Sequence, residues 1–197
     1  MARGLRLNEP GRAWAALAVA LGAGALLGLL VPAPEWDWQP SKAAEPWRWW
    51  TAAFVHLNGL HLAGNLLGLV VVAALGVVGR LPQRAALAWA LAWPLAHGVL
   101  LLRPEVTHYA GLSGVLHAGV AVAVTWLVLE GRRRRVAMAI GAGLVAKLLL
   151  EQPWGAPVTV SATLGIPVVP LAHAGGALVG LVLALLLHRR DSAEEQR

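Results

Sequence analysis

Residues 110–129 read AGLSGVLHAGVAVAVTWLVL, a run without Asp, Glu, Lys or Arg that opens on small residues around a serine. About 20 apolar residues in a helix span the hydrocarbon core of a bilayer. Gly111 and Gly114 flank Ser113 closely, and glycine lets another backbone approach. The stretch therefore predicts a membrane helix with a serine hydroxyl at its N-terminal end. The role of this serine depends on which residues face it.

The composition of the whole chain agrees with a membrane protein. Of 197 residues, 58% are hydrophobic, 13% are charged and none is cysteine. This composition indicates a polytopic membrane protein and excludes disulfides and thiolate metal sites. The net charge of +6 comes from arginines in short clusters between apolar runs. That arrangement is typical of loops that orient helices, so we do not expect a nucleic-acid partner.

Six apolar segments predict an all-α fold, a six-helix membrane bundle. The segments are residues 13–31, 51–78, 84–102, 110–129, 136–150 and 170–187. The second is overlong, so we expect its first turns at or above the membrane interface. The first follows Arg3, Arg6 and Arg12 and has some features of a signal peptide. We prefer an uncleaved anchor, because the run is long and no small-residue cleavage site is evident after Val31.

The basic residues predict the orientation of the bundle. Six spans place most of them on one side, namely Arg3, Arg6, Arg12, Arg80, Arg84, Arg132, Arg133, Arg134, Arg135, Arg189, Arg190 and Arg197. Cytoplasmic loops carry such an excess, so both termini are predicted to be cytoplasmic. The expected organisation is a basic N-terminus (1–12), a membrane domain (13–188) and a charged tail (189–197).

Two outer connections have distinctive compositions. Residues 31–50 contain five tryptophans, and because tryptophan prefers the headgroup layer we expect a loop lying in the interface. An ordinary aromatic belt and a dedicated role both remain open for it. Residues 151–169 are rich in Pro and Gly without helical periodicity. They predict a mobile cap over a site.

Four polar residues fall in one layer of the predicted bundle. Depth is counted from the cytoplasmic arginines at ~1.5 Å per residue. Ser113 and His61 then lie roughly 28 Å up, His173 roughly 24 Å and Asn65 about 22 Å. Polar groups at membrane depth are costly, so their shared layer near the outer surface indicates a functional site.

This set of residues suits acyl transfer. A serine hydroxyl becomes a nucleophile when an imidazole removes its proton. An Asn amide, a histidine and the backbone N–H groups at a helix start are suitable donors for an oxyanion. His61 and Asn65 are four residues apart and share a helix face, and Ser113 gains the positive end of its helix dipole. The pieces predict a serine hydrolase that requires no acidic third member.

The chain resembles the rhomboid family of intramembrane serine proteases. The resemblance rests on four motifs in order along residues 47–180: Trp47-Arg48; His56, His61 and Asn65; Gly111-Leu112-Ser113-Gly114; and His173 with Gly176 and Gly180. It implies a six-helix rhomboid-like fold and no cofactor. It further implies that Ser113 is the nucleophile and His173 the general base, and that His61, Asn65 and the Ser113 amide form the oxyanion hole. Gly176 and Gly180 would pack the sixth helix tightly on the fourth.

A finer resemblance points to the rhombosortase subfamily. It rests on His117, where most rhomboids have tyrosine, on the small six-span size and on residues 147–152, KLLLEQ. It implies a bacterial inner-membrane enzyme that cleaves secreted proteins with a C-terminal Gly-Gly motif, an apolar helix and a basic end. Hydrolysis and transfer to another nucleophile both remain open, and the sequence does not define an oligomeric state.

His117 has a second interpretation. It lies four residues after Ser113, and helical side chains lean toward the N-terminus, so it points toward the serine. It is a rival for the base, although two residues on one helix rarely align for proton transfer. We therefore expect it to pack against or orient His173.

The other polar residues have structural interpretations. His56 is expected to brace a loop, and His97 and His108 are expected to be structural. Lys147 and Glu151 are four residues apart and are expected to pair, which lowers the cost of Lys147 in lipid.

Three alternatives compete with a serine protease. A zinc protease would carry His-Glu-x-x-His, which is absent here, so no metal is expected. A transporter is disfavoured because the polar layer lies away from the midplane. An inactive rhomboid-like protein that captures membrane helices usually lacks the serine or the base, and both are present.

Overall fold

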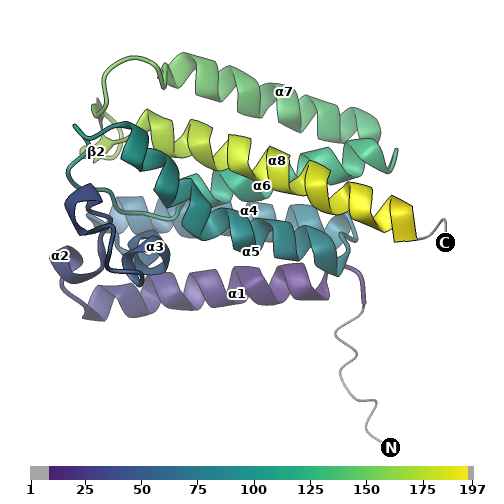
Figure 1. Cartoon of the computed structure of the whole chain (residues 1–197), viewed down its shortest axis with the longest axis horizontal. Coiled ribbons are helices and arrows are strands. Elements are labelled where there is room, and N and C mark those ends of the chain that lie inside the picture. The colour runs from purple at the N-terminus through teal and green to yellow at the C-terminus, as the bar shows by residue number, and fades with distance from the viewer. Residues whose placement is uncertain (1–8, 195–197) are drawn as a thin grey trace, which may run out of the picture.

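The computed structural model describes residues 9–194, with side chains described as far as His188. Its long helices are α1 (Arg12–Leu27), α4 (Gly59–Val78), α5 (Gln83–Gly98), α6 (Ser113–Leu129), α7 (Arg134–Glu151) and α8 (Pro170–Glu194). The short elements are α2 (Ala33–Trp36), α3 (Arg48–Thr51), the 3₁₀ turns η1 (Gly28–Leu30), η2 (Pro40–Lys42), η3 (Ala52–Phe54) and η4 (Val99–Leu102), and the strands β1 (Thr159–Ser161) and β2 (Ile166–Val168). The long helices lie side by side in a bundle, with α7 and α1 on opposite flanks (Figure 1).

Within residues 9–194, four segments are long and apolar enough to cross a membrane. They are Arg12–Leu30, Gly59–Val78, Gln83–Leu102 and Pro170–His188. The protein is therefore a mostly helical multi-pass membrane protein, as the sequence predicts. Helix α6 is apolar but has 17 residues, and the 18 residues of α7 include Arg134, Arg135, Lys147 and Glu151. Six crossings consequently remain a prediction.

Helix α6 forms the centre of the bundle. It packs against α4, α5, α7 and α8, and most of its side chains are buried. Helices α1 and α5 add large aromatic groups to the same core, with Trp14 and Trp89 in contact at a centroid distance of 4.4 Å. The indole of Trp89 donates to the carbonyl oxygen of Val115 at 2.8 Å, which satisfies its N–H in the dry core. In contrast, Ala137 is the single buried residue of α7 in the described helix, so this helix lies at the rim.

Two glycines bring α8 against the backbone of α6. A Cβ at Gly176 would lie 2.1 Å from the carbonyl oxygen of Gly114, and one at Gly180 would lie 2.5 Å from that of Ala118. Both distances are far inside van der Waals contact. Only glycine permits this approach, which agrees with what the resemblance noted in the sequence implies for these two positions.

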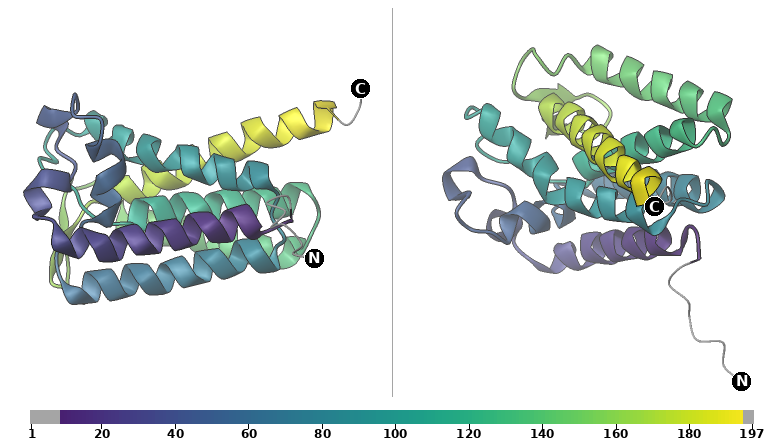
Figure 2. Two further views of the ribbon diagram at one scale, coloured as in Figure 1. Left: turned by 90° about the horizontal axis from the view of Figure 1, so that it is seen from below. Right: turned by 45° about the vertical axis from the view of Figure 1, so that its right-hand side comes forward.

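The connecting segments gather at two ends of the bundle. At one end the Gly11 amide donates to the Leu81 carbonyl oxygen, and the Arg132 guanidinium donates to the carbonyl oxygen of Arg80. The distribution of arginines predicts that these connecting segments lie on the same side of the membrane. The start of α1 and the end of α8 lie at this end, opposite the short elements α2 and α3 (Figures 1 and 2).

The second and sixth apolar segments differ from their predicted bounds. Helix α4 begins at Gly59 rather than at residue 51, because Asn58 caps it by accepting from the His61 amide at 2.8 Å. The residues before it form α3 and η3. Helix α8 continues beyond residue 187 to Glu194. Residues 1–8 of the expected basic N-terminus and 195–197 of the expected tail lie outside the described residues.

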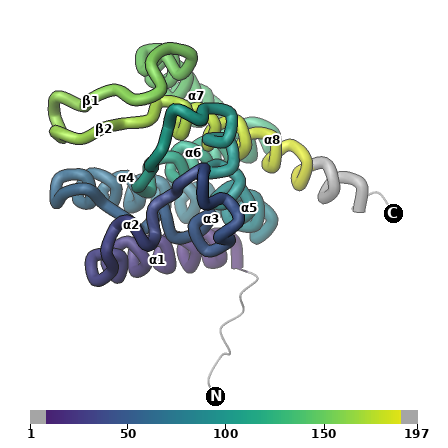
Figure 3. Tube along the Cα trace, turned by 60° about the vertical axis from the view of Figure 1, so that its left-hand side comes forward, coloured from purple at the N-terminus to yellow at the C-terminus, as the bar shows by residue number. Residues whose placement is uncertain are grey.

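Both outer connections contain more secondary structure than expected. Residues 31–50 fold into α2, η2 and α3, and Trp38 is fully buried edge-on against Trp49 with ring centroids 4.8 Å apart. Trp47 and Trp50 remain 48% and 44% exposed. Trp38 thus packs inside the loop itself, while the position of the loop in the membrane interface stays a prediction. Residues 159–168 form an antiparallel hairpin in which Thr159 pairs with Val168, visible in Figure 3, where no secondary structure was expected.

Candidate active site

Ser113 is the first residue of α6 and follows a tight turn. Gly111 has a φ of +120°, a backbone conformation that side chains disfavour, so the residue type is required here. The hydroxyl of Tyr109 accepts from the Gly114 amide and donates to the Gly111 carbonyl oxygen, each at 3.3 Å. Burial raises the pKa of Tyr109, so its hydroxyl stays protonated and braces the turn.

The serine hydroxyl faces an imidazole from α8. Ser113 Oγ lies 2.8 Å from His173 Nε2, although the two residues are 60 positions apart in sequence. The close approach of α6 and α8 occurs at Gly114, next to Ser113, and at Gly176, about one turn after His173, and it brings the two side chains together. The arrangement permits transfer of the hydroxyl proton to the ring.

The other nitrogen of the same ring faces a carboxylate. His173 Nδ1 lies 2.7 Å from Oε2 of Glu151, the last residue of α7. A carboxylate only accepts, so Nδ1 carries the proton and Nε2 is left to accept from Ser113. The expected pair of Lys147 and Glu151 is present, with Nζ 2.5 Å from Oε1.

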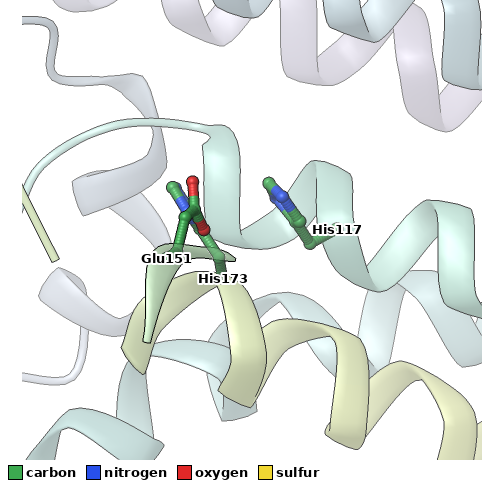
Figure 4. Close-up of side chains that lie close together, drawn as sticks. All are labelled: His117, Glu151 and His173. Carbon is green, nitrogen blue, oxygen red and sulfur yellow. The ribbon is translucent and has the colours of Figure 1, made fainter. Parts of the chain in front are cut away.

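His117 lies beside this group on α6. Its Nδ1 donates to the carbonyl oxygen of Ser113 at 2.7 Å, and its ring stacks on that of His173 with a centroid distance of 4.3 Å. Figure 4 shows the two imidazoles and Glu151 arriving from three different helices. His117 therefore contacts His173 and does not form the bond to Ser113 Oγ.

His61 and Asn65 of α4 face the other side of the turn. A Cβ on Gly111 would lie 2.6 Å from His61 Nε2 and 3.5 Å from Asn65 Nδ2, so the His61 ring leaves no room for a side chain at position 111. His61 Nδ1 accepts from the Leu57 amide at 3.3 Å, which leaves the proton on Nε2 and directs it inward. Asn65 Nδ2 is buried without a partner among the described residues. A buried donor without a partner is costly, and a bound anion would satisfy it.

A cavity of about 220 Å³ opens on these groups. Ser113, His173, His61 and Asn65 all line it. The hairpin closes one wall of the cavity with apolar side chains. The side-chain amide of Asn58 donates to the Leu164 carbonyl oxygen at 2.8 Å, which ties the start of α4 to that wall. Ser113 therefore borders open space in the cavity.

The model of the rhomboid domain matches residues 43–190, three quarters of the chain. The chain belongs to the rhomboid family. No curated protein matches the sequence. The family is one of intramembrane proteases and includes inactive members.

The Trp-Arg motif of this rhomboid protein lies outside the serine site. Arg48 is buried and pairs with Glu45 at 2.6 Å and with Asp37 at 3.2 Å. Its Nη1 also donates to the backbone carbonyl oxygens of Pro34 and Asp37. Arg48 thus organises the loop above the cavity, whereas Trp47 is half exposed.

The remaining histidines hold backbone or loop contacts. His56 Nδ1 donates to the Phe54 carbonyl oxygen at 3.1 Å, and burial lowers the pKa of His56 so that it stays neutral. His97 bonds the carbonyl oxygen of Trp49, and His108 bonds Asp37. Each contact suits the structural role expected for that residue.

The hydrogen bonds around His173 do not suit a metal ion. Within the described part of the chain, one group of metal-ligand type brings its ligand atoms within 4.8 Å, namely His117, Glu151 and His173. Both nitrogens of His173 are engaged, one by Ser113 and one by Glu151. The imidazole rings of His117 and His173 are parallel within 11°, so their in-plane lone pairs do not converge on one metal position.

Two residues of this rhomboid site, Glu151 and Tyr109, were not predicted from the sequence. A signal for Glu151 was present, because it lies 16 residues after Arg135 and thus roughly 24 Å up, in the layer of His173. Tyr109 carried no comparable signal, since it lies in a loop where depth cannot be counted.

Proposed function

We propose that this rhomboid protein is an active intramembrane serine endopeptidase with Ser113 as nucleophile and His173 as general base. The single observation that carries the proposal is the 2.8 Å contact between Ser113 Oγ and His173 Nε2 at a helix N-terminus. An inactive relative would have no use for a hydroxyl aligned on a correctly protonated imidazole.

The contacts support a two-step acyl transfer. Ser113 Oγ attacks the scissile carbonyl carbon while His173 Nε2 takes its proton, and His173 then gives that proton to the departing amine. His61 Nε2, Asn65 Nδ2 and the Ser113 amide serve as donors to the oxyanion. Water from the cavity then attacks the acyl-enzyme, with His173 acting as base again.

The distribution of charge supports the side on which cleavage occurs. Arg80 and Arg132 meet at the end of the bundle opposite the hairpin, and such arginines mark the cytoplasmic face. We place the site at the extracytoplasmic side of a bacterial inner membrane, in a six-span domain with both termini inside. Single-pass substrates are then cut near their outer membrane boundary.

We further propose substrates with a C-terminal Gly-Gly motif, an apolar helix and a basic end. A substrate helix must unwind for its carbonyl to reach Ser113, and glycine disfavours helix while exposing its backbone. A basic end favours the cytoplasmic side, which leaves the Gly-Gly motif at the level of Ser113. His117 and residues 147–152, which resemble the rhombosortase subfamily, support the same class of substrate.

The test uses the purified full-length protein in liposomes with a tagged substrate of this design. Ser113→Ala is compared with Ser41→Ala, because Ser41 is an exposed serine in η2 outside the cavity. We expect cleavage at the Gly-Gly motif by the wild type and by Ser41→Ala, and none by Ser113→Ala.

Two results separate the parts of the proposal. Cleavage that persists in Ser113→Ala contradicts the enzyme assignment. Equal cleavage of substrates with Gly-Gly and Val-Val motifs contradicts the tail preference and leaves a general rhomboid protease.

A further inference from the structure

We infer that Glu151 acts through His173 as a positioning residue and completes a Ser113–His173–Glu151 triad. The inference rests on the proposed function and adds a carboxylate to the pair that the motifs supply. It concerns a residue of α7, whereas Ser113 belongs to α6 and His173 to α8.

Both oxygens of Glu151 are engaged in ways that aim the carboxylate at the ring. Oε2 lies 2.7 Å from His173 Nδ1, and Oε1 lies 2.5 Å from Lys147 Nζ. The Glu151 side chain is 25% exposed, against 47% for that of Lys147. The carboxylate thus points into the bundle while the ammonium lies at its rim.

Pairing with Lys147 alone does not explain this orientation. A surface Lys–Glu pair one turn apart forms along the outside of a helix and needs no third group. Most of α7 faces outward, yet its last residue turns toward α8. The side chain reaches the one ring whose opposite nitrogen contacts Ser113.

Glu151 is the acidic group in contact with His173 among the described residues. The other charged or titratable groups around that ring are Lys147 on α7, His117 on α6 and His61 on α4. None of them accepts the Nδ1 proton in the structure. Removing the carboxylate therefore leaves none of these described groups to accept the Nδ1 proton of His173.

Two consequences follow for the reaction. The carboxylate keeps the proton on Nδ1, so that Nε2 is free to take the proton of Ser113. It also stabilises the imidazolium that forms when that transfer occurs, an interaction that is stronger in the transition state than before it. The loss of Glu151 should therefore lower kcat with little change in KM.

The experiment compares Glu151→Gln, Glu151→Asp and Lys147→Met with the wild type in liposomes. Glu105→Gln is the matched control, since Glu105 is an exposed acid in the loop before α6. Two rates are measured: cleavage of the tagged substrate, and labelling of Ser113 by a fluorophosphonate, which needs no protein substrate. We expect Glu151→Gln to lower kcat and the labelling rate by about 10²-fold or more at unchanged KM. We expect Glu151→Asp to recover part of this loss and Lys147→Met to lose only a few-fold.

The outcomes separate this inference from the proposed function. Cleavage and labelling by Glu151→Gln within a few-fold of the wild type overturn the triad, and so does a loss that appears only in KM. A Glu151→Asp variant no better than Glu151→Gln also counts against it, provided that both variants fold as judged by thermal unfolding. Wild-type protein that labels at Ser113 but cleaves no substrate contradicts the proposed protease activity and leaves the triad supported by its labelling rates.

Discussion

The imidazole rings of His117 and His173 stack with centroids 4.3 Å apart and planes within 11°. His117 Nδ1 also donates to the backbone carbonyl oxygen of Ser113 at 2.7 Å. His117 therefore touches the backbone of one partner of the proposed pair and the side chain of the other. It limits rotation of His173 about its own axis without competing for the Ser113 hydroxyl.

We predict that His117→Ala slows cleavage modestly while His173→Ala abolishes it. Loss of an aromatic contact costs about 1 kcal/mol, which corresponds to about a five-fold lower rate. The kcat of each variant is measured with the tagged substrate. His188→Ala, on the same helix as His173 but packed on Trp126, is the control and should retain activity. Activity that survives in His173→Ala but not in His117→Ala would exchange the two roles.

Removal of the Asn65 amide should slow the chemical step. Asn65 Nδ2 is buried without a partner among the described residues, so it is available to the oxyanion. We predict that Asn65→Ala lowers kcat by about 10²–10³-fold at similar KM, the effect of losing one oxyanion donor. Single-turnover cleavage measures this step directly. An unchanged rate would remove Asn65 from the proposed oxyanion hole.

A methyl group at Gly176 should separate α8 from α6. The added Cβ would lie 2.1 Å from the Gly114 carbonyl oxygen, so the helices must move apart and Ser113 must lose its alignment with His173. We predict a fall in kcat of about 10²-fold. Gly143→Ala is the matched control, because nothing lies within 4 Å of a Cβ there. Equal activity of the two alanine variants would contradict the packing argument.

Truncation of Arg48 should destabilise the outer loop more than truncation of its neighbour. Arg48→Ala removes the buried cation beside Asp37 and the donor to the Asp37 carbonyl oxygen, a cost of about 1–3 kcal/mol, although Gln39 and His108 still contact the Asp37 carboxylate. Trp47 is 48% exposed, so Trp47→Ala should cost clearly less. Denaturant unfolding in mixed micelles measures both free energies. If the free energy of unfolding falls less in Arg48→Ala than in Trp47→Ala, the buried ion pair is not the stabilising contact.

The apolar segments and the depth of the polar residues were predictable from the sequence. Uninterrupted hydrophobicity defines membrane helices, and counting from the arginines placed Ser113, His61, Asn65 and His173 in one layer. The structure brings these four residues to one cavity. The close packing of α8 on α6 at Gly176 and Gly180 followed from the family resemblance, and the structure places both glycines against the α6 backbone.

Rotation of helices and folding of loops were not predictable in the same way. Depth alone does not show which way a side chain faces, so Glu151 was predicted to pair with Lys147 and its contact with His173 was not foreseen. Strands of three residues are too short for an alternating pattern, which hid the hairpin at residues 159–168. Trp38 was expected in the headgroup layer, but a tryptophan that lines a loop's own core has the same local sequence.

Cleavage of the tagged Gly-Gly substrate by Ser113→Ala in liposomes tests the central claim most directly. Ser113 Oγ supplies the attacking atom in the proposed reaction, so the wild type and Ser41→Ala should release the product and Ser113→Ala should release none. Product formed by folded Ser113→Ala at the wild-type rate would contradict the assignment of this rhomboid protein as a serine protease.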